Sequence, residues 1–414
     1  MKFGIKTLDD FDVKGKTVLC RVDINQPVDK KTGQLKSTAR IEACVPTLKE
    51  LSERGAKLVL LAHQGSDIEY KNYYTLAPHR DVLARLLSMD VKFIPDVCGP
   101  AAQEAVKALE PGEILLLDNV RFMAEEQTLF ENNVHLSHEE QAKTQVVAKL
   151  APLADLYVCD AFAASHRDQP SLCGFEQVLP SAMGRLFEKE YAVLAGLMTD
   201  PAHPSVFVLG GAKVADAFLM MGTVLENGSA DEILTGGLAA NIVLAAKGLP
   251  IGEKSLAYIW DKGYGEFIAK AQELVEKYGD RIVAPVDLAY LAEGKRCEAK
   301  PADLPADALC LDIGHETVEL YQKKIRSAAT VFVNGPMGVF EEAETEYGTK
   351  EVWEALGDTK AHTVLGGGDS ITATTKYGKT KDLSYICTGG GAMIRFLSGK
   401  EMPVVTALKH GAEL

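Results

Sequence analysis

Short apolar runs alternate with amphipathic stretches along almost the whole chain of 414 residues. Apolar runs bounded by turn signals are typical of buried strands, and an apolar period of 3.6 residues is typical of helices. The alternation predicts an α/β protein made of βαβ units around parallel sheets. In the first half we expect strands at 17–24, 57–62, 91–95, 113–118 and 156–160, with helices near 38–54, 76–88, 100–109 and 137–150.

The same alternation restarts at PSVFVLGG, from residue 204, and we expect it to continue to the end of the chain. Between the two halves, the segment 181–198 (SAMGRLFEKEYAVLAGLM) follows a proline and predicts one continuous helix. A chain of this length suggests about two domains. We therefore expect the helix to join them.

The residues that end the strands differ between the halves. Five strands of the second half end in glycine: VFVLGG, EILTGG, VFVNGP, TVLGGG and ICTGGG. Strands of the first half are followed instead by Arg21, Asp23, Asn25, His63, Asp118, Asn119, Arg121, Asp160, His166 and Arg167. Ligands of open parallel sheets bind outside the carboxyl ends of the strands. Glycine there lets backbone N–H groups approach a phosphate, and arginine grips a small anion. The pattern predicts a nucleotide site in the second half and a site for a small acidic molecule in the first.

Composition narrows the classes of protein. The net charge of −14 argues against a nucleic-acid binder, which usually carries a basic stripe. The eight cysteines are scattered without a CxxC pair, which favours a reducing compartment. No signal peptide and no membrane-spanning run is evident. We expect a cytoplasmic protein without membrane or nucleic-acid partners.

Two familiar phosphate signatures are absent. Both GKT tripeptides lack the earlier glycine of a Walker A loop, since Asp10 and Ala373 stand there. The lack of a GxGxxG motif weighs against an NAD-dependent oxidoreductase. The loop GGGDS (366–370) has two interpretations: a tight turn with Asp369 or Ser370 as the helix N-cap, or a phosphate loop in which Asp369 holds a nucleotide-bound Mg²⁺.

Arg21 and Asp23 are two residues apart on a predicted strand and so share a face, where they either pair with each other or face a ligand. Arg40 falls in the first turn of a predicted helix, where its charge opposes the helix dipole. Helix stability therefore does not explain Arg40, which favours a functional role.

Two histidine-containing segments also have alternatives. The pair His166–Arg167 lies beside Asp160 and is either part of the ligand site or a buried salt bridge. His135 and His138 lie in a polar stretch with no cysteine or acidic residue that completes a metal set, so we expect them at the surface.

Eight segments together resemble phosphoglycerate kinases in that family's order and spacing. They are RVDINQPV (21–28), RIEACVPTL (40–48), LLDNVRF (116–122), DAFAASHR (160–167), VLGGAKVAD (208–216), VNGPMGVFE (333–341), LGGGDS (365–370) and CTGGGA (387–392). The resemblance implies two doubly wound, Rossmann-like domains that face a cleft and are joined by a helix. It implies a 3-phosphoglycerate-binding domain at 1–180, a connecting helix at 181–198, a nucleotide-binding domain at 199–400, and a segment 401–414 that returns to the first domain.

The implied activity is reversible phosphoryl transfer between 1,3-bisphosphoglycerate and ADP, with Mg²⁺ bound to the nucleotide. By motif position, the implied substrate-binding residues are Asp23, Asn25, Arg40, His63, Gln64, Gly65, Ser66, Arg121 and Arg167. The implied nucleotide-binding residues are Gly211, Lys213, Gly236, Asn334, Glu341, Gly366, Gly367, Gly368, Asp369 and Ser370, with Asp369 as the Mg²⁺ ligand. The implied catalytic groups are Arg40, Lys213, Gly389 and Gly390.

The chain departs from the family pattern at several positions. Ser66 stands where an arginine is expected, and Ala217 where many members have a second lysine. Ala163 replaces a common glycine and His315 replaces a usual proline. Because two positive charges are missing, a phosphate-ligand binding protein without catalysis, a decayed kinase, is the alternative function. The oligomeric state, monomer or homodimer, is left open.

Overall fold

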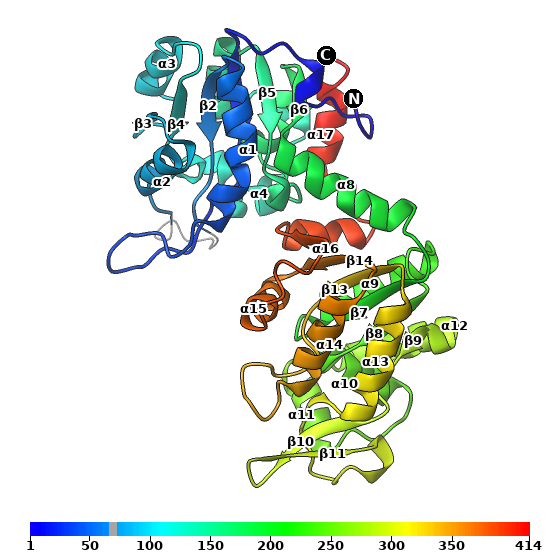
Figure 1. Cartoon of the computed structure of the whole chain (residues 1–414). Helices are drawn as coiled ribbons and strands as arrows, with labels where there is room; N and C mark the ends of the chain where they lie inside the picture. The colour runs from blue at the N-terminus through cyan, green and yellow to red at the C-terminus, as the bar shows by residue number, and fades with distance from the viewer. Residues whose placement is uncertain (66–72) are drawn as a thin grey trace. The chain divides into compact units, whose positions relative to one another are not determined.

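The computed structural model describes residues 1–65 and 73–414. The chain divides into two compact units: unit 1 comprises Met1–Ala192 with Glu401–Leu414, and unit 2 comprises Val193–Lys400 (Figure 1). Both termini therefore belong to unit 1. Among the described residues, no helix is both long and apolar enough to cross a membrane. All eight cysteines are free.

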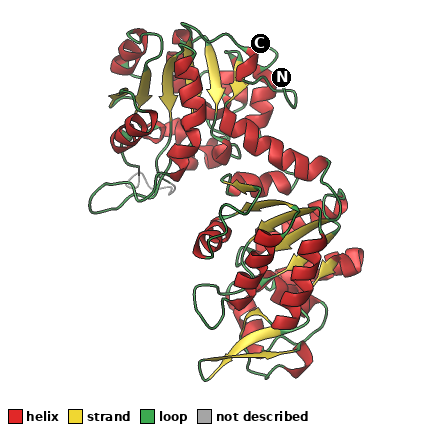
Figure 2. Ribbon diagram, in the orientation of Figure 1, coloured by secondary structure: helices red, strands yellow, loops and turns green. Residues whose placement is uncertain are grey.

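Unit 1 is built on a parallel sheet of six strands in the order β3-β4-β2-β1-β5-β6. The strands are β1 (Thr17–Arg21), β2 (Lys57–Leu61), β3 (Val91–Ile94), β4 (Ile114–Leu117), β5 (Leu156–Cys159) and β6 (Ser181–Met183). The side chains of Leu58, Val59, Leu60 and Leu61 are all fully buried, as expected for a strand covered on both faces. Helices lie on both faces of the sheet (Figure 2).

The helices of unit 1 include the expected ones, with one correction. They are α1 (Ala39–Glu53), α2 (Ala77–Leu87), α3 (Pro100–Lys107), α4 (Thr128–Val134), α5 (His138–Gln141), α6 (Gln145–Leu150), α7 (Pro170–Cys173) and α17 (Pro403–Gly411). The single helix expected at 137–150 is wrong, because α5 and α6 are separate. Ser137 caps α5 through the backbone of Glu140, and Thr144 opens α6.

The single helix expected at 181–198 is also wrong at its start. Ser181–Met183 forms strand β6, which pairs with β5, and helix α8 covers Arg185–Thr199. Asp160, at the end of β5, accepts hydrogen bonds from the backbone N–H groups of Leu186 and Phe187 in the first turn of α8. The two units divide within this helix, after Ala192.

Unit 2 contains a second six-stranded parallel sheet, in the order β15-β14-β13-β7-β8-β9. Its strands are β7 (Ser205–Leu209), β8 (Glu232–Thr235), β9 (Ile282–Val283), β13 (Thr330–Asn334), β14 (His362–Gly366) and β15 (Tyr385–Cys387). Its helices are α9 (Val214–Glu226), α10 (Gly237–Ala246), α11 (Glu253–Asp261), α12 (Glu266–Tyr278), α13 (His315–Ser327), α14 (Tyr347–Asp358), α15 (Gly368–Lys376) and α16 (Gly391–Leu397). The fold class predicted from the sequence is confirmed.

An antiparallel sheet interrupts the alternation in unit 2. Its strands, in the order β11-β10-β12, are β10 (Leu288–Ala292), β11 (Lys295–Ala299) and β12 (Cys310–Ile313). The tight connection at Glu293–Gly294, where both residues have positive φ, joins β10 to β11 as a hairpin. The expectation of uninterrupted alternation is therefore wrong in this region.

The order of strands marks one position at the carboxyl edge of each sheet. In unit 1 the chain adds β2, β3 and β4 on one side of β1 and then β5 and β6 on the other. In unit 2 it adds β8 and β9 on one side of β7 and β13, β14 and β15 on the other. Ligands of open α/β sheets bind at such reversals. Ligand sites are therefore expected at the carboxyl ends of β1 and β5 in unit 1 and of β7 and β13 in unit 2.

Candidate active site

In unit 1 the arginine of the first helical turn is held by a carboxylate from the central strand. Arg40 is the second residue of α1, and its Nη1 lies 2.9 Å from Oδ2 of Asp23. The Asp23 side chain is only 5% exposed, whereas that of Arg40 is 42% exposed. Strand β1 ends at Arg21, so the expectation that Asp23 lies on the strand is wrong, and its ion pair is with Arg40 rather than Arg21. The guanidinium of Arg40 is anchored on one side and open to solvent on the other.

His63, after β2, is a neutral donor because of a buried arginine. Nη2 of Arg21 lies 3.2 Å from Nδ1 of His63. A guanidinium can only donate, so Nδ1 is the acceptor and the proton of the neutral ring is on Nε2. Burial, followed by the charges of Arg21, Arg121, Arg40 and Arg167, holds the pKa of His63 well below its usual value. Nε2 faces Asn25 Nδ2 at 3.4 Å, which is also a donor, so the Nε2 proton is available to an anion.

Arg21 itself is fixed by a buried network that the sequence did not reveal. Its Nε donates to Ser171 Oγ over 3.0 Å, and its Nη1 donates to the carbonyl of Val22 over 2.7 Å. Ser171 Oγ donates in turn to Glu126 over 2.7 Å. Glu126 is fully buried, and desolvation raises its pKa to about 7. No local motif signals this network, because its members are more than a hundred residues apart from Arg21.

Two further arginines, Arg121 and Arg167, lie near Arg21, Arg40 and His63, and these five residues form the basic edge of unit 1. Arg121 is 2% exposed, its Nη1 donates to Thr128 Oγ1 over 3.3 Å, and its guanidinium lies 5.4 Å from the centre of the Tyr73 ring. Burial lowers the pKa of Arg121. Arg167 lies 3.6 Å from Glu131. A salt bridge is thus present in this segment, but it is partly exposed and its acidic partner is Glu131, whereas Asp160 caps α8.

The predicted residues Gln64 and Gly65 lie between β2 and the segment that is not described. Gly65 donates its N–H to Asn25 Oδ1 over 3.1 Å, which orients the Asn25 amide. The Gln64 carboxamide is used internally, because Nε2 donates to the Gln26 carbonyl and Oε1 accepts from the Gln26 N–H. The Gln64 side chain therefore has no group directed to a ligand. Ser66 lies outside the described residues.

In unit 2 the ends of β7 and β13 approach so closely that they exclude side chains. A Cβ on Gly210 would lie 2.2 Å from the carbonyl oxygen of Pro336, and one on Gly335 would lie 2.2 Å from the carbonyl oxygen of Gly210. Packing also explains Gly236, against Met337, and Gly366, against Met393. Gly236 and Gly366 thus serve the fold, and neither lines the pockets found in this unit.

The glycine loop after β14 differs from both expected versions of a capped turn. Gly367 is the N-cap of α15, so neither Asp369 nor Ser370 has that role. Ser370 Oγ instead accepts the N–H of Gly335 over 2.7 Å, which ties this loop to the end of β13. A Cβ on Gly368 would meet nothing within 4 Å. Neither packing nor a positive φ requires a glycine there, which favours close approach of a ligand to the backbone.

Two adjoining hollows lie along this edge. The first is lined by Gly210, Gly211, Ala212, Lys213, Asn334, Gly335, Gly367, Gly368, Asp369, Ser370 and Ile394. The second, with a volume of about 290 Å³, shares Gly211, Ala212 and Asp369 with the first. Lys213 and Asp369 are exposed at the first hollow, and Glu341 lies at the second. Gly389 and Gly390 precede α16, which contributes Ile394 to the first hollow.

The larger hollow has an apolar wall that the sequence analysis missed. Its residues include Leu238, Tyr258, Leu288, Leu309 and Leu311. Leu288 and Leu311 belong to the antiparallel sheet, whose strands were not predicted. The hollow combines this apolar wall with the exposed carboxylate of Glu341, an arrangement suited to a flat ring that carries a hydroxylated sugar.

Position 217, where a lysine is absent, is buried in the structure. Ala217 is only 2% exposed, on the inner face of α9. Lys247, at the end of α10, donates to the carbonyl of Ile282 at the opposite edge of the sheet, where β9 begins. The charge is therefore not replaced by Lys247.

Comparisons with known proteins agree over nearly the whole chain. The family model for phosphoglycerate kinase matches residues 8–400. The phosphoglycerate kinase of Methanothermobacter thermautotrophicus is 44% identical over 99% of this chain and 98% of its own length. That of Thermococcus kodakarensis is 42% identical over 98% and 97%.

Solved structures give the same result. The crystal structure of phosphoglycerate kinase from Pyrococcus horikoshii superposes with a TM-score of 0.87 at 40% identity and covers 99% of this chain and 100% of that chain. The structure of phosphoglycerate kinase from Coxiella burnetii has a TM-score of 0.83 at 29% identity, with 98% of each chain covered. The chain therefore belongs to the phosphoglycerate kinase family.

Proposed function

We propose that the basic edge of unit 1 binds 3-phosphoglycerate or 1,3-bisphosphoglycerate and that the glycine-lined edge of unit 2 binds ATP or ADP. The kinase activity itself, reversible phosphoryl transfer between 1,3-bisphosphoglycerate and ADP, follows from family membership. The observation that supports this assignment is the cluster of arginines around His63. Burial, followed by the charges of four arginines, lowers the pKa of His63, and an acidic substrate would balance the charge of these arginines.

At the basic edge of unit 1, Arg40, Arg121 and Arg167 bind the phosphate and carboxylate groups of the substrate. His63 donates its Nε2 proton, and Asp23 and Asn25 accept and donate to the hydroxyl and carboxyl end. Asp23 also holds Arg40 through the ion pair of 2.9 Å. Arg40 therefore keeps its orientation when charge develops on the moving phosphoryl group.

In the nucleotide site, the apolar wall receives the base and Glu341 the ribose, while Lys213 and backbone N–H groups near Gly368, Gly389 and Gly390 bind the phosphates. Asp369 fits a role in holding Mg²⁺, since its carboxylate is exposed at the phosphate hollow and α15 begins one residue before it. Bound with the nucleotide, the ion neutralises phosphate charge.

Catalysis then consists of positioning and charge stabilisation, without a covalent intermediate. The in-line reaction requires both ligands in one place, although their binding residues belong to different units. We propose closure with α8 as the hinge, and small-angle scattering tests it. The radius of gyration should fall most with 3-phosphoglycerate and ADP together, and an unchanged value in the ternary complex would contradict closure.

The test of the function is a coupled assay of ATP-dependent turnover of 3-phosphoglycerate. Turnover that requires both substrates and Mg²⁺ supports the proposal. Binding of both ligands without turnover would instead support the decayed kinase, for which the comparisons give no support. We also propose that the enzyme works in the cytoplasm as a monomer or homodimer, which light scattering of the purified protein distinguishes.

A further inference from the structure

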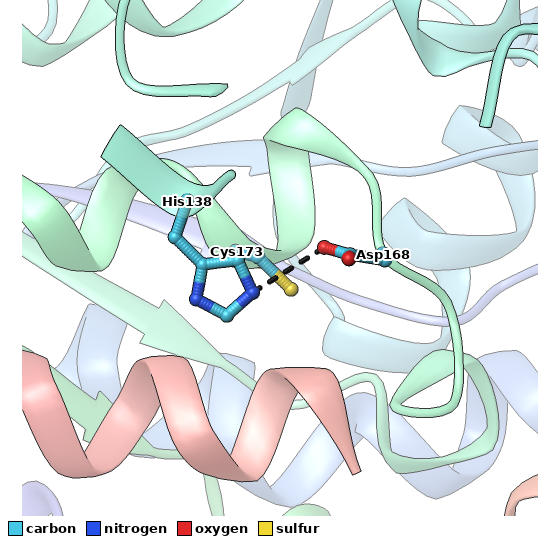
Figure 3. A group of neighbouring side chains, drawn as sticks. All are labelled: His138, Asp168 and Cys173. Atoms are coloured by element: carbon cyan, nitrogen blue, oxygen red, sulfur yellow. Dashed lines mark ion pairs between the residues drawn. The ribbon is translucent and has the colours of Figure 1, made fainter. Parts of the chain in front are cut away.

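Three side chains from separate segments of unit 1 converge outside the proposed substrate contacts. They are His138 of α5, Asp168 of the loop just before α7, and Cys173 at the end of α7 (Figure 3). One ligand atom from each lies within 4.8 Å of the other two. The sequence predicts His135 and His138 at the surface; His135 is exposed, whereas His138 is partly buried and lies beside Asp168 and Cys173. The two partners are thirty or more residues later in the chain.

The geometry points to a site for a thiophilic divalent cation such as Zn²⁺, bound by His138 Nε2, the Asp168 carboxylate and Cys173 Sγ. Zinc accepts imidazole nitrogen, carboxylate oxygen and thiolate, and it is usually tetrahedral. Bonds of about 2.0–2.1 Å in a tetrahedron place neighbouring nitrogen and oxygen ligands about 3.3 Å apart. His138 Nε2 and Asp168 Oδ1 are separated by 3.3 Å.

A fourth group is directed at the same carboxylate. Gln141, at the end of α5, is 1% exposed, and its Nε2 donates to Asp168 Oδ1. Its Oε1 is buried and has no hydrogen-bond partner among the residues that the structure describes. A buried amide oxygen without a partner is costly. Nε2 of Gln141 also donates to the carbonyl of Leu136 over 3.2 Å, so the amide orients the Asp168 carboxylate, and water is the candidate for the fourth position.

Binding exchanges protons for the ion. The thiol of Cys173 contacts the Arg167 carbonyl at 3.7 Å, and burial raises its pKa well above the usual value. The cation displaces the thiol proton to solvent as the sulfur–metal bond forms, and the imidazole binds through its unprotonated Nε2. One thiolate and one carboxylate balance the charge of a divalent ion at this partly buried site. The affinity should therefore rise with pH.

Cobalt(II) is the probe, because thiolate ligation gives it a near-ultraviolet charge-transfer band and tetrahedral geometry gives it strong visible bands. The nucleotide-free protein, stripped of metals with a chelator, is titrated with Co²⁺ and then with Zn²⁺. We expect both sets of bands to saturate at one equivalent and to disappear as Zn²⁺ displaces the cobalt. The absence of both bands at saturating Co²⁺ would overturn the site.

Matched variants identify the ligands. Cys173→Ala should abolish the charge-transfer band, whereas Cys297→Ala, at a cysteine outside the cluster, should keep it. His138→Asn should weaken cobalt binding about tenfold or more, whereas His135→Asn, at the neighbouring exposed histidine, should not. His138 is partly exposed, so its variant remains informative if removal of the buried thiol impairs folding. Bands that survive both cluster substitutions, or that depend on Cys297, would contradict the assignment.

Discussion

The ion pair between Arg40 and Asp23 allows the stability and the catalytic role of Arg40 to be separated. The Arg40 side chain is 42% exposed, so solvent screens part of its attraction to Asp23, but the 5% exposed Asp23 carboxylate would lose its partner, and the free energy of unfolding should fall by about 1–3 kcal/mol. The loss of a donor that stabilises transition-state charge typically costs about 2.7–4 kcal/mol, or about 10²–10³ in rate. Arg40→Ala should therefore lower kcat by about 10²–10³, with only a modest fall in Tm and little change in KM.

Arg80 provides a matched control. Its side chain is also 42% exposed and is also paired with an aspartate, Asp81, at 3.2 Å. Because Asp81 is 72% exposed, Arg80→Ala should lower Tm less than Arg40→Ala does, and it should leave kcat nearly unchanged. The assay is steady-state turnover of 3-phosphoglycerate at saturating ATP, with thermal unfolding of each variant. A normal kcat for Arg40→Ala, or an equal loss for Arg80→Ala, would refute the transition-state role.

Five further changes test other parts of the account. Lys213→Ala should lower kcat, while Asp369→Ala should weaken Mg-nucleotide binding and be partly rescued by higher Mg²⁺ in a titration followed by calorimetry. Ala217→Lys should lower Tm without tightening ATP, because position 217 is 2% exposed and a buried ammonium is costly; a tenfold lower KM for ATP would show that the charge is missed. Glu298 raises the pKa of His315 by a hydrogen bond, so protonated His315 stabilises the fold below its unfolded pKa of about 6.5, and the benefit is lost as pH rises through the higher folded value; the difference in Tm between wild type and His315→Gln should thus be larger at acid than at alkaline pH. Removal of residues 403–414 deletes α17, whose Val404 and Leu408 are fully buried in unit 1, and should abolish turnover but leave nucleotide binding measurable by calorimetry.

The sequence was sufficient where a structural property is local. The strand runs and the glycines that follow them predicted both parallel sheets, because burial on both faces requires apolar runs and close strand ends require glycine. The antiparallel sheet was missed because β11, KRCEA, is polar, and Ser181–Met183 was read as helix because a strand of three residues carries no period.

Interactions between distant residues could not be predicted. Pairing of Asp23 with Arg21, two residues away, was one of two alternatives, whereas the fold pairs Asp23 with Arg40. Similarly, the Arg21–Ser171–Glu126 network and the His138–Asp168–Cys173 cluster depend on loops that meet only after folding. Residue type together with position at a helix start or a strand end identified Arg40 and His63 as candidates, but the tautomer of His63 follows only from the position of Arg21.

The central claim is that each unit binds one substrate, and hydrogen exchange of the full-length protein with each ligand alone tests it most directly. Saturating 3-phosphoglycerate should slow exchange at the ends of β1, β2 and β5, near Asn25, Gly65 and Arg167. Saturating MgADP should instead slow exchange after β7, β13 and β14, near Gly211, Gly335 and Gly368. Protection of the glycine loops by 3-phosphoglycerate alone, or of the basic edge by MgADP alone, would contradict the account.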